Sequence, residues 1–104
     1  MKIRLKKGHF FPRWLGVSGI TLYPYILVAI KNPTRSLIAH ELVHIDQVRG
    51  LGYFRFYVSY VLYYWANRLS GMPDFNAYWE IPYEKSARLG EQNKIMLRRA
   101  DEII

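Results

Sequence analysis

Residues 38–47 read I-A-H-E-L-V-H-I-D-Q, and this stretch governs how the rest of the chain is interpreted. Within it, His40 and His44 stand four positions apart, and Glu41 directly follows the first histidine in the pattern H-E-x-x-H. On an α-helix, positions i and i+4 lie one turn apart on the same face, so both imidazole rings can reach a single point. A Zn²⁺ ion at that point would sit at about 2.0–2.1 Å from each ring nitrogen. The pattern therefore predicts a metal site built on a helix.

Glu41 has the position of a general base in this pattern. It is rotated by about 100° around the helix from His40, so it lies close to such an ion without being its natural third ligand. A base that takes a proton from a metal-bound water has to be at that place. The sequence therefore predicts metal-assisted hydrolysis.

The residues around the motif carry the signals of a helix over about residues 33–49. Asn32 would cap this helix, Pro33 would occupy its first position, and Gly50 would follow its end. Apolar side chains recur at helical spacing and would bury one side while the histidines lie on another. These apolar residues are Leu37, Ile38, Leu42, Ile45 and Val48.

The segment before the motif has the composition of a small sheet. Residues 1–8 alternate basic and apolar side chains, as in a short edge strand guarded by lysines or a loose basic arm. Residues 9–16 carry loop signals, and residues 17–30 read as one or two strands in which Pro24 forces a bend, a turn or an edge position. A strand over residues 26–30 would lead into the motif helix, either as a core strand or as an edge strand that pairs with an extended peptide.

Two further main helices are expected after the motif helix. Residues 53–69 are apolar nearly all round, so we expect this helix to be covered on most sides, to back the motif helix and to supply the core. Asp74 then looks like the cap of a short helical turn. The third main helix begins at about Pro82, carries Glu84 in its first turn and runs past Met96.

Length and composition limit the chain to one domain. A chain of 104 residues with 51% hydrophobic residues builds a single core and has no room for a second. We therefore predict a single α+β domain over residues 1–104, with three main helices and an N-terminal sheet of two or three strands. The lack of cysteine excludes both a disulfide framework and a cysteine-ligated zinc site.

The formal net charge of +7 favours acidic partners: nucleic acid, anionic lipid or an acidic substrate. Apart from K-I-R-L-K-K at residues 2–7 the charges are scattered, which argues for a solvated surface and against a nucleic-acid partner. Residues 14–30 and 52–69 are rich in apolar side chains, but neither forms the clean run of about 20 that a spanning helix needs. Contact with a membrane surface stays open. Because no signal peptide is recognisable, we expect a cytoplasmic protein.

A catalytic zinc needs three protein ligands and one position open for water, so the two histidines require a partner from elsewhere in the chain. His9 stands among aromatic residues and is better explained as a packed or exposed side chain. With no cysteine present, a carboxylate is the expected donor. The candidates are Asp46, Asp74, Glu80, Glu84 and Glu91.

The positions of these carboxylates in the expected helices favour some of them over others as the third ligand. Asp46 points about 200° away from the second histidine of the motif, and Asp74 is better explained as a cap. Glu80 and Glu84 stand one turn apart, and both can face the motif helix. We favour Glu84 because it lies within the third helix, where its backbone is fixed, whereas Glu80 lies at the junction.

The chain resembles the zincin metallopeptidases, and among them the gluzincins, whose third ligand is a glutamate on a later helix. The matching pieces are S-L-I-A-H-E-L-V-H-I-D-Q at residues 36–47 and I-P-Y-E-K-S-A at residues 81–87. The second piece is similar to a segment, N/I-P-F/Y-E-x-x-A, of small bacterial and phage-type zincin domains. The resemblance spans most of residues 17–90, and its specific part is H-E-x-x-H.

This resemblance implies a minimal zincin-like domain that acts as a zinc-dependent metallopeptidase on a peptide or protein substrate. Carried over by position, it makes His40, His44 and Glu84 the Zn²⁺ ligands. It makes Glu41 the base that activates a zinc-bound water to hydrolyse a peptide or amide bond.

Further residues are candidates for supporting roles. Tyr78, Tyr83 or Arg88 would stabilise the oxyanion that forms during hydrolysis, and Asp46 or Gln47 would orient a histidine from behind.

Two other interpretations stand beside the hydrolase. The first is a zincin-fold interaction module that keeps its metal for structure, or does without it, in a larger assembly. The second is a membrane-surface protein that uses the basic arm and the aromatic segment at residues 53–69.

Overall fold

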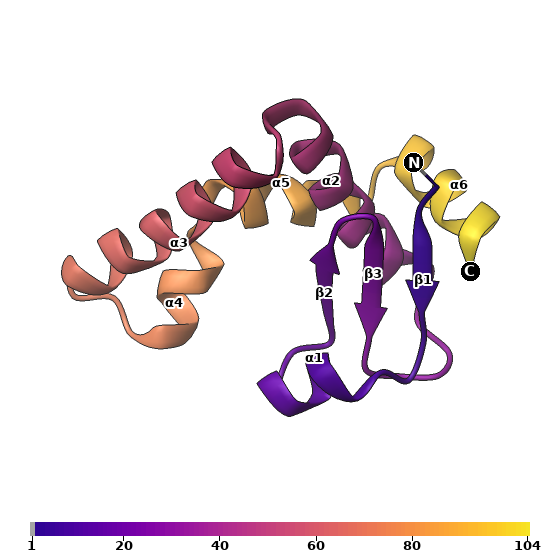
Figure 1. Cartoon of the computed structure of the whole chain (residues 1–104), viewed down its shortest axis with the longest axis horizontal. Coiled ribbons are helices and arrows are strands. Elements are labelled where there is room, and N and C mark those ends of the chain that lie inside the picture. The colour runs from indigo at the N-terminus through magenta and orange to yellow at the C-terminus, as the bar shows by residue number, and fades with distance from the viewer. Residues whose placement is uncertain (1) are drawn as a thin grey trace.

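The computed structural model describes residues 2–104 and has the expected α+β architecture, with a three-stranded sheet followed by the main helices (Figure 1). β1 (Arg4–Lys6) pairs in parallel with β3 (Tyr25–Val28). β2 (Gly19–Leu22) pairs antiparallel with β3, so the sheet order is β1-β3-β2. Pro24 lies in the tight connection between β2 and β3, where a residue without an N–H does not interrupt the ladder. β3 is thus the central core strand, and the edge strand on the motif side is β2.

A short helix replaces the loop expected at residues 9–16, so that prediction is wrong. α1 (Phe10–Leu15) begins after His9, whose Nδ1 accepts a hydrogen bond from the backbone N–H of Phe11 at 3.1 Å. It ends at Gly16, which has a φ of 78°. His9 therefore caps a helix, as the side-chain acceptor that an N-terminus needs.

The motif helix is α2 (Arg35–Leu51), and it begins two residues later than expected. Its cap is Thr34, whose hydroxyl accepts a hydrogen bond from a backbone N–H of the first turn at 3.1 Å. The predicted start at Pro33 with Asn32 as the cap is wrong because the threonine hydroxyl satisfies the free N–H instead. Gly52, with a φ of 88°, separates α2 from the next helix.

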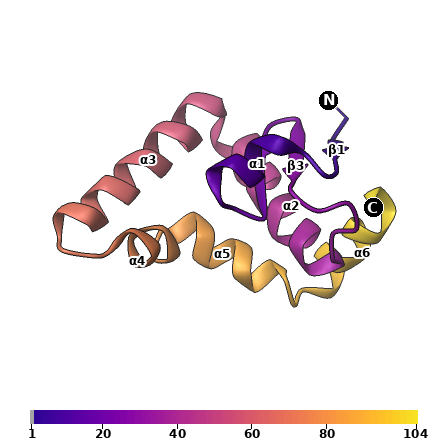
Figure 2. The same cartoon turned by 90° about the horizontal axis from the view of Figure 1, so that it is seen from below.

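α3 (Tyr53–Leu69) has the predicted bounds, but the expectation that it is covered on most sides is wrong. It packs against α2 and α4 (Asp74–Trp79) along one side. Figure 2 shows α3 running away from α2, with α4 and then α5 returning alongside it. Within residues 2–104, no helix has the length and apolar content needed to cross a membrane.

The third main helix is broken in two, contrary to the prediction of one helix past Met96. α5 (Pro82–Gly90) ends before a short turn, and α6 (Lys94–Ile103) begins after it. The Asn93 side chain accepts hydrogen bonds from two backbone N–H groups of α6 at 3.0 and 3.1 Å, so it starts a new helix. Asp74 is not a cap either, because Pro73 precedes α4 and no side-chain bond caps that helix.

The core lies between β3 and α2 and is closed by α6. Its buried members are Ile26, Val28, Ile38, Ala39, Leu42, Ile45 and Ala100. On another side, α5 packs closely on α2 at Gly90, where an added Cβ would lie only 2.4 Å from Val43 Cγ2. Because Gly90 has no side chain, α5 can pack this closely on α2. Glu84, on α5, therefore lies near the helix that carries the histidines.

Candidate metal centre

The two histidines of the motif lie on one face of α2, as their spacing predicts. Their ring centroids are 5.1 Å apart, with 73° between the ring planes. The side chain of His44 is 5% exposed and that of His40 is 14% exposed. α2 therefore presents two nearly buried imidazoles to α5 on successive turns.

Glu84 on α5 completes a three-residue cluster with these histidines. Its Oε1 lies 2.9 Å from Nε2 of His40 and 3.1 Å from Nε2 of His44. One donor atom from each of the three residues lies within 4.8 Å of the others. Glu84 is thus buried at the histidines, whereas Glu80 forms an ion pair elsewhere. Two imidazoles and one carboxylate are a ligand set that suits a catalytic zinc.

Three of the other candidate carboxylates have partners outside the cluster, and the fourth, Glu91, contacts His40 on the far side of its ring. Asp46 forms an ion pair with Arg99 at 2.7 Å, so it does not orient a histidine. Glu80 forms an ion pair with Lys85, also at 2.7 Å. Asp74 accepts a hydrogen bond from the hydroxyl of a tyrosine on α3.

The Nδ1 atom of each histidine, on the side of the ring away from Glu84, forms a hydrogen bond with a second side chain. Oε2 of Glu91 lies 2.8 Å from Nδ1 of His40. Oε1 of Gln47 lies 2.8 Å from Nδ1 of His44, as one of the two sequence alternatives predicted. Gln47 donates its amide N–H to the carbonyl of Tyr83 at 3.1 Å, which fixes which end of the amide faces His44. Both Nδ1 atoms therefore donate, and a neutral ring keeps its Nε2 lone pair directed at the centre of the cluster.

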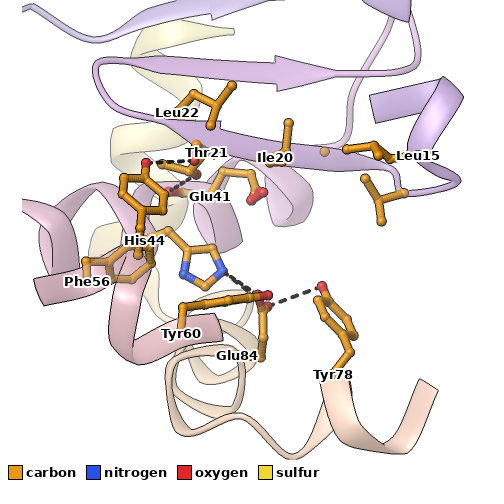
Figure 3. Close-up of a pocket in the computed structure, with 13 residues that line it drawn as sticks. Leu15, Ile20, Thr21, Leu22, Glu41, His44, Phe56, Tyr60, Tyr78 and Glu84 are labelled. Atoms are coloured by element: carbon orange, nitrogen blue, oxygen red, sulfur yellow. Dashed lines mark hydrogen bonds and ion pairs between the residues drawn. The ribbon is translucent and has the colours of Figure 1, made fainter. Parts of the chain in front are cut away.

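Glu41 lies beside the cluster with its carboxylate buried and incompletely bonded. The residue is 4% exposed, and its Oε2 is buried with no hydrogen-bond partner among residues 2–104. Burying a polar atom without a partner is costly, so its position needs an explanation such as a catalytic role. Figure 3 shows Glu41 on the same cavity as His44 and Glu84.

Two cavities meet at Glu41. One, of about 320 Å³, also reaches His44 and Glu84 and has largely apolar walls, which include Ile20, Leu22 and Phe56. The other, of about 660 Å³, reaches His40 and runs along the start of α2 towards α4. A ligand that extends through both would pass the Glu41 carboxylate.

Two tyrosine hydroxyls lie at the Glu84 carboxylate. Tyr60 donates to Oε2 of Glu84 at 2.6 Å, and Tyr78 donates to Oε1 at 3.3 Å. Of the predicted oxyanion donors, only Tyr78 lies at the cluster, since the Tyr83 hydroxyl bonds to a serine of α3. Arg88 donates to the carbonyl of Trp79, and its guanidinium lies over that ring.

Tyr60 was not predicted from the sequence. It lies one turn after Phe56, the buried residue of α3, so it shares the side of the helix that faces the site. The spacing from Phe56 identifies Tyr60 only once the buried side of α3 is known, and that side is known from the structure.

The edge strand β2 passes beside Glu41. The hydroxyl of Thr21 donates to the backbone carbonyl of Glu41 at 3.2 Å, which joins β2 to α2. The carbonyl of Thr21 accepts from the hydroxyl of Tyr57 at 2.9 Å, so it points towards the free edge of the sheet. Backbone direction alternates along a strand, so Gly19, two residues earlier, turns its N–H and C=O to the same edge.

The carboxylates around the two histidines shift the pKa values of the cluster in favour of positive charge on the imidazoles. Although burial acts to lower it, hydrogen bonds to Glu84 and Glu91 and the charge of Glu41 raise the pKa of His40 to about 9. The pKa of His44 is raised against burial by the same kinds of contact. Burial favours the neutral form of Glu84, but hydrogen bonds from both imidazoles hold the pKa of this carboxyl well below its usual value.

Burial raises the pKa of Glu41, and the two histidine charges act against that shift. Without a metal, two imidazolium charges thus balance the buried carboxylates. A divalent cation held by two neutral imidazoles supplies the same two positive charges, so the residues present fit Zn²⁺.

A scan against protein-family models, a search of curated proteins and a search of solved structures each found no match to this chain. The resemblance to zincins therefore stays a prediction from the sequence motifs.

Replacing Glu84 tests which carboxylate completes the cluster. Glu84→Gln should lower zinc affinity at least about tenfold, because it removes an anionic ligand that two imidazoles face. Glu80→Gln is the matched control and should bind zinc like the parent, because the Glu80 carboxylate forms an ion pair with Lys85 outside the cluster. Affinity is measured by competition with a chromogenic chelator. Equal zinc affinity in the Glu84→Gln protein and the parent would exclude Glu84 as a ligand.

The pH dependence of stability tests the charge balance. In chelator, the stabilisation from His40 is fully present below its unfolded pKa of 6.5 and is lost as the pH rises through about 9. The free energy of unfolding of the metal-free protein should therefore fall by about 3 kcal/mol over this window. Zinc requires neutral imidazoles, so its added stabilisation should grow over the same window. Urea unfolding at both ends of the window measures each, and a metal-free stability that rises with pH would contradict the account.

Proposed function

We propose that this chain is a zinc-dependent hydrolase that cleaves a peptide or amide bond, with Glu41 as the general base. The observation that carries the proposal is the buried Glu41 carboxylate, whose Oε2 has no partner within residues 2–104 although it adjoins the His40, His44 and Glu84 cluster. A merely structural metal site has no need of a second buried carboxylate that is left without a partner at its side.

The cluster residues would hold the metal. His40 and His44 would bind through Nε2, and Glu84 through its carboxylate, while Glu91 and Gln47 keep the two rings in place. Zinc bound there would polarise the substrate carbonyl and lower the pKa of a water molecule to about 7.

Glu41 would move the protons of the reaction. As a carboxylate, it takes a proton from the attacking water and then delivers it to the leaving amine. Burial raises its pKa, which strengthens it as a base, and the positive charge of an occupied cluster keeps it ionised.

The two tyrosines would share the remaining tasks. Tyr60 donates a short hydrogen bond to Glu84 and would orient this ligand. Tyr78 makes the longer contact of 3.3 Å, so its hydroxyl is the donor that can turn to a developing oxyanion. Burial raises the pKa of each, so both hydroxyls stay protonated and able to donate.

The surroundings suit an extended chain. The two cavities meet at Glu41, and the edge of β2 next to it directs backbone groups outward at Gly19 and Thr21. An extended peptide forms backbone hydrogen bonds with such an edge and places alternate side chains in pockets. The apolar walls at Ile20 and Phe56 would receive an apolar side chain.

Removing the base should separate chemistry from metal binding. Glu41→Gln keeps the shape of the side chain but cannot accept the proton, so zinc binding should persist. Hydrolysis of a peptide library by the zinc-loaded protein, followed by mass spectrometry, should fall by two to four orders of magnitude, the range expected for loss of an acid–base catalyst. Glu102→Gln, at an exposed position on α6, is the control and should leave the rate unchanged.

Two results would contradict the hydrolase. A Glu41→Gln protein as active as the parent would exclude Glu41 as the base. A zinc-loaded parent that cleaves no member of the library, and that loses most of its stability on chelation, would instead have a structural metal site.

A further inference from the structure

We propose that the outer face of α3 docks on an anionic lipid bilayer. Six apolar side chains form this face, here called the α3 stripe: Phe54, Val58, Val61, Leu62, Trp65 and Leu69. They are between 41% and 86% exposed, which is unusual for a row of large apolar residues on one helix.

The α3 stripe is continuous along the helix. Its members follow one another at intervals of three or four residues or stand side by side, so they cover about 100° of the circumference. From Phe54 to Leu69 the row is about 22 Å long at 1.5 Å per residue. Nothing in residues 2–104 covers it, because α3 packs on α2 and α4 with its other side.

The opposite side of α3 builds the metal centre. Phe56 is 3% exposed there and packs its ring against His44, and Tyr60 donates to Glu84. The α3 stripe is therefore not needed for the site, and its exposure is not a by-product of building the cavity. Figures 1 and 2 show α3 at the periphery of the molecule, so a flat surface can approach it.

The charges on α3 determine the kind of partner. Exposed Arg55 and Arg68 fall at the two borders of the stripe, near opposite ends of the helix. No aspartate or glutamate occurs between Asp46 and Asp74. An apolar row with aromatic rings and bordering arginines is the arrangement of a helix that lies in a lipid interface, where arginines reach anionic headgroups.

A second copy of this chain fits the same face less well. Pairing two α3 stripes would bring bordering arginines to an interface in which α3 supplies no carboxylate, so their charges would be unpaired. The formal net charge of +7 likewise favours an anionic surface over another copy.

Trp65 serves as the reporter for docking. The chain has three tryptophans, so Trp14→Phe with Trp79→Phe leaves Trp65 alone on the α3 stripe. With phosphatidylcholine vesicles that contain phosphatidylserine, its fluorescence should shift to the blue and be quenched by brominated acyl chains. Vesicles of phosphatidylcholine alone should give a weaker effect, and added salt should reduce binding to the anionic ones.

Three pairs of substitutions in this background, one of them a control, test whether the α3 stripe is the surface that contacts the lipid. Leu62→Ser with Leu69→Ser should weaken vesicle binding at least about tenfold, because two exposed apolar side chains no longer enter the lipid. Leu89→Ser with Ile95→Ser, which alters residues 77% and 70% exposed on α5 and α6, is the control and should bind like the parent. Arg55→Gln with Arg68→Gln should weaken binding to anionic vesicles about tenfold and leave binding to neutral ones unchanged.

Circular dichroism and zinc affinity should be the same in all variants, since the exchanged side chains are exposed and lie away from the metal centre. Three results would overturn the proposal: no binding of the parent to anionic vesicles, equal binding by the Leu62→Ser, Leu69→Ser protein, or a dimer in sedimentation that buries Trp65.

Discussion

The buried negative charge between α2 and α5 is the constraint on which the rest of the structure depends. Glu41 and Glu84 are both less than 5% exposed and lie at the same cavity, where two ionised carboxylates would repel each other without nearby positive charge. His40 and His44 lie against Glu84, and the neighbouring carboxylates raise the pKa of both imidazoles although burial acts to lower it. A divalent cation would meet the same demand by binding the imidazole lone pairs in place of protons. The close contact of α5 on α2, the two hydrogen bonds behind the imidazoles, and the tyrosines from α3 and α4 all hold these charges together.

Much of this arrangement could be predicted from local patterns in the sequence. Helical spacing places His40 and His44 on one face whatever the remaining fold, and the apolar positions of the same segment define its buried side. α3 begins and ends where Gly52 and Ser70 interrupt the pattern, so its bounds were predicted correctly. Glu84 could be preferred over other carboxylates because it lies in a helix that begins with a proline, which fixes its backbone. Its contact with the histidines could be known only from the tertiary structure.

The predictions that are wrong depend on side chains whose partners lie outside the local pattern. α1 is capped by His9, which is not among the residues favoured at helix starts, so its segment resembled a loop. The break between α5 and α6 is made by Asn93, whose preference for caps was outweighed by the helical pattern on both sides. The contacts of Tyr60 and Glu91 with the cluster depend on how α3 and α5 are rotated about their axes relative to α2. No spacing along the chain determines that rotation. The exposed side of α3 was missed for the same reason, since an apolar composition does not reveal which side lacks a neighbour.

Zinc-edge anomalous diffraction from crystals grown with Zn²⁺ would locate the ion. One strong peak is expected at about 2.0–2.2 Å from Nε2 of His40, Nε2 of His44 and the carboxylate of Glu84, with Glu41 beside it but not bound to it. A peak at other residues, or no peak between α2 and α5 while the three side chains keep their direct contacts, would contradict the proposed metal centre.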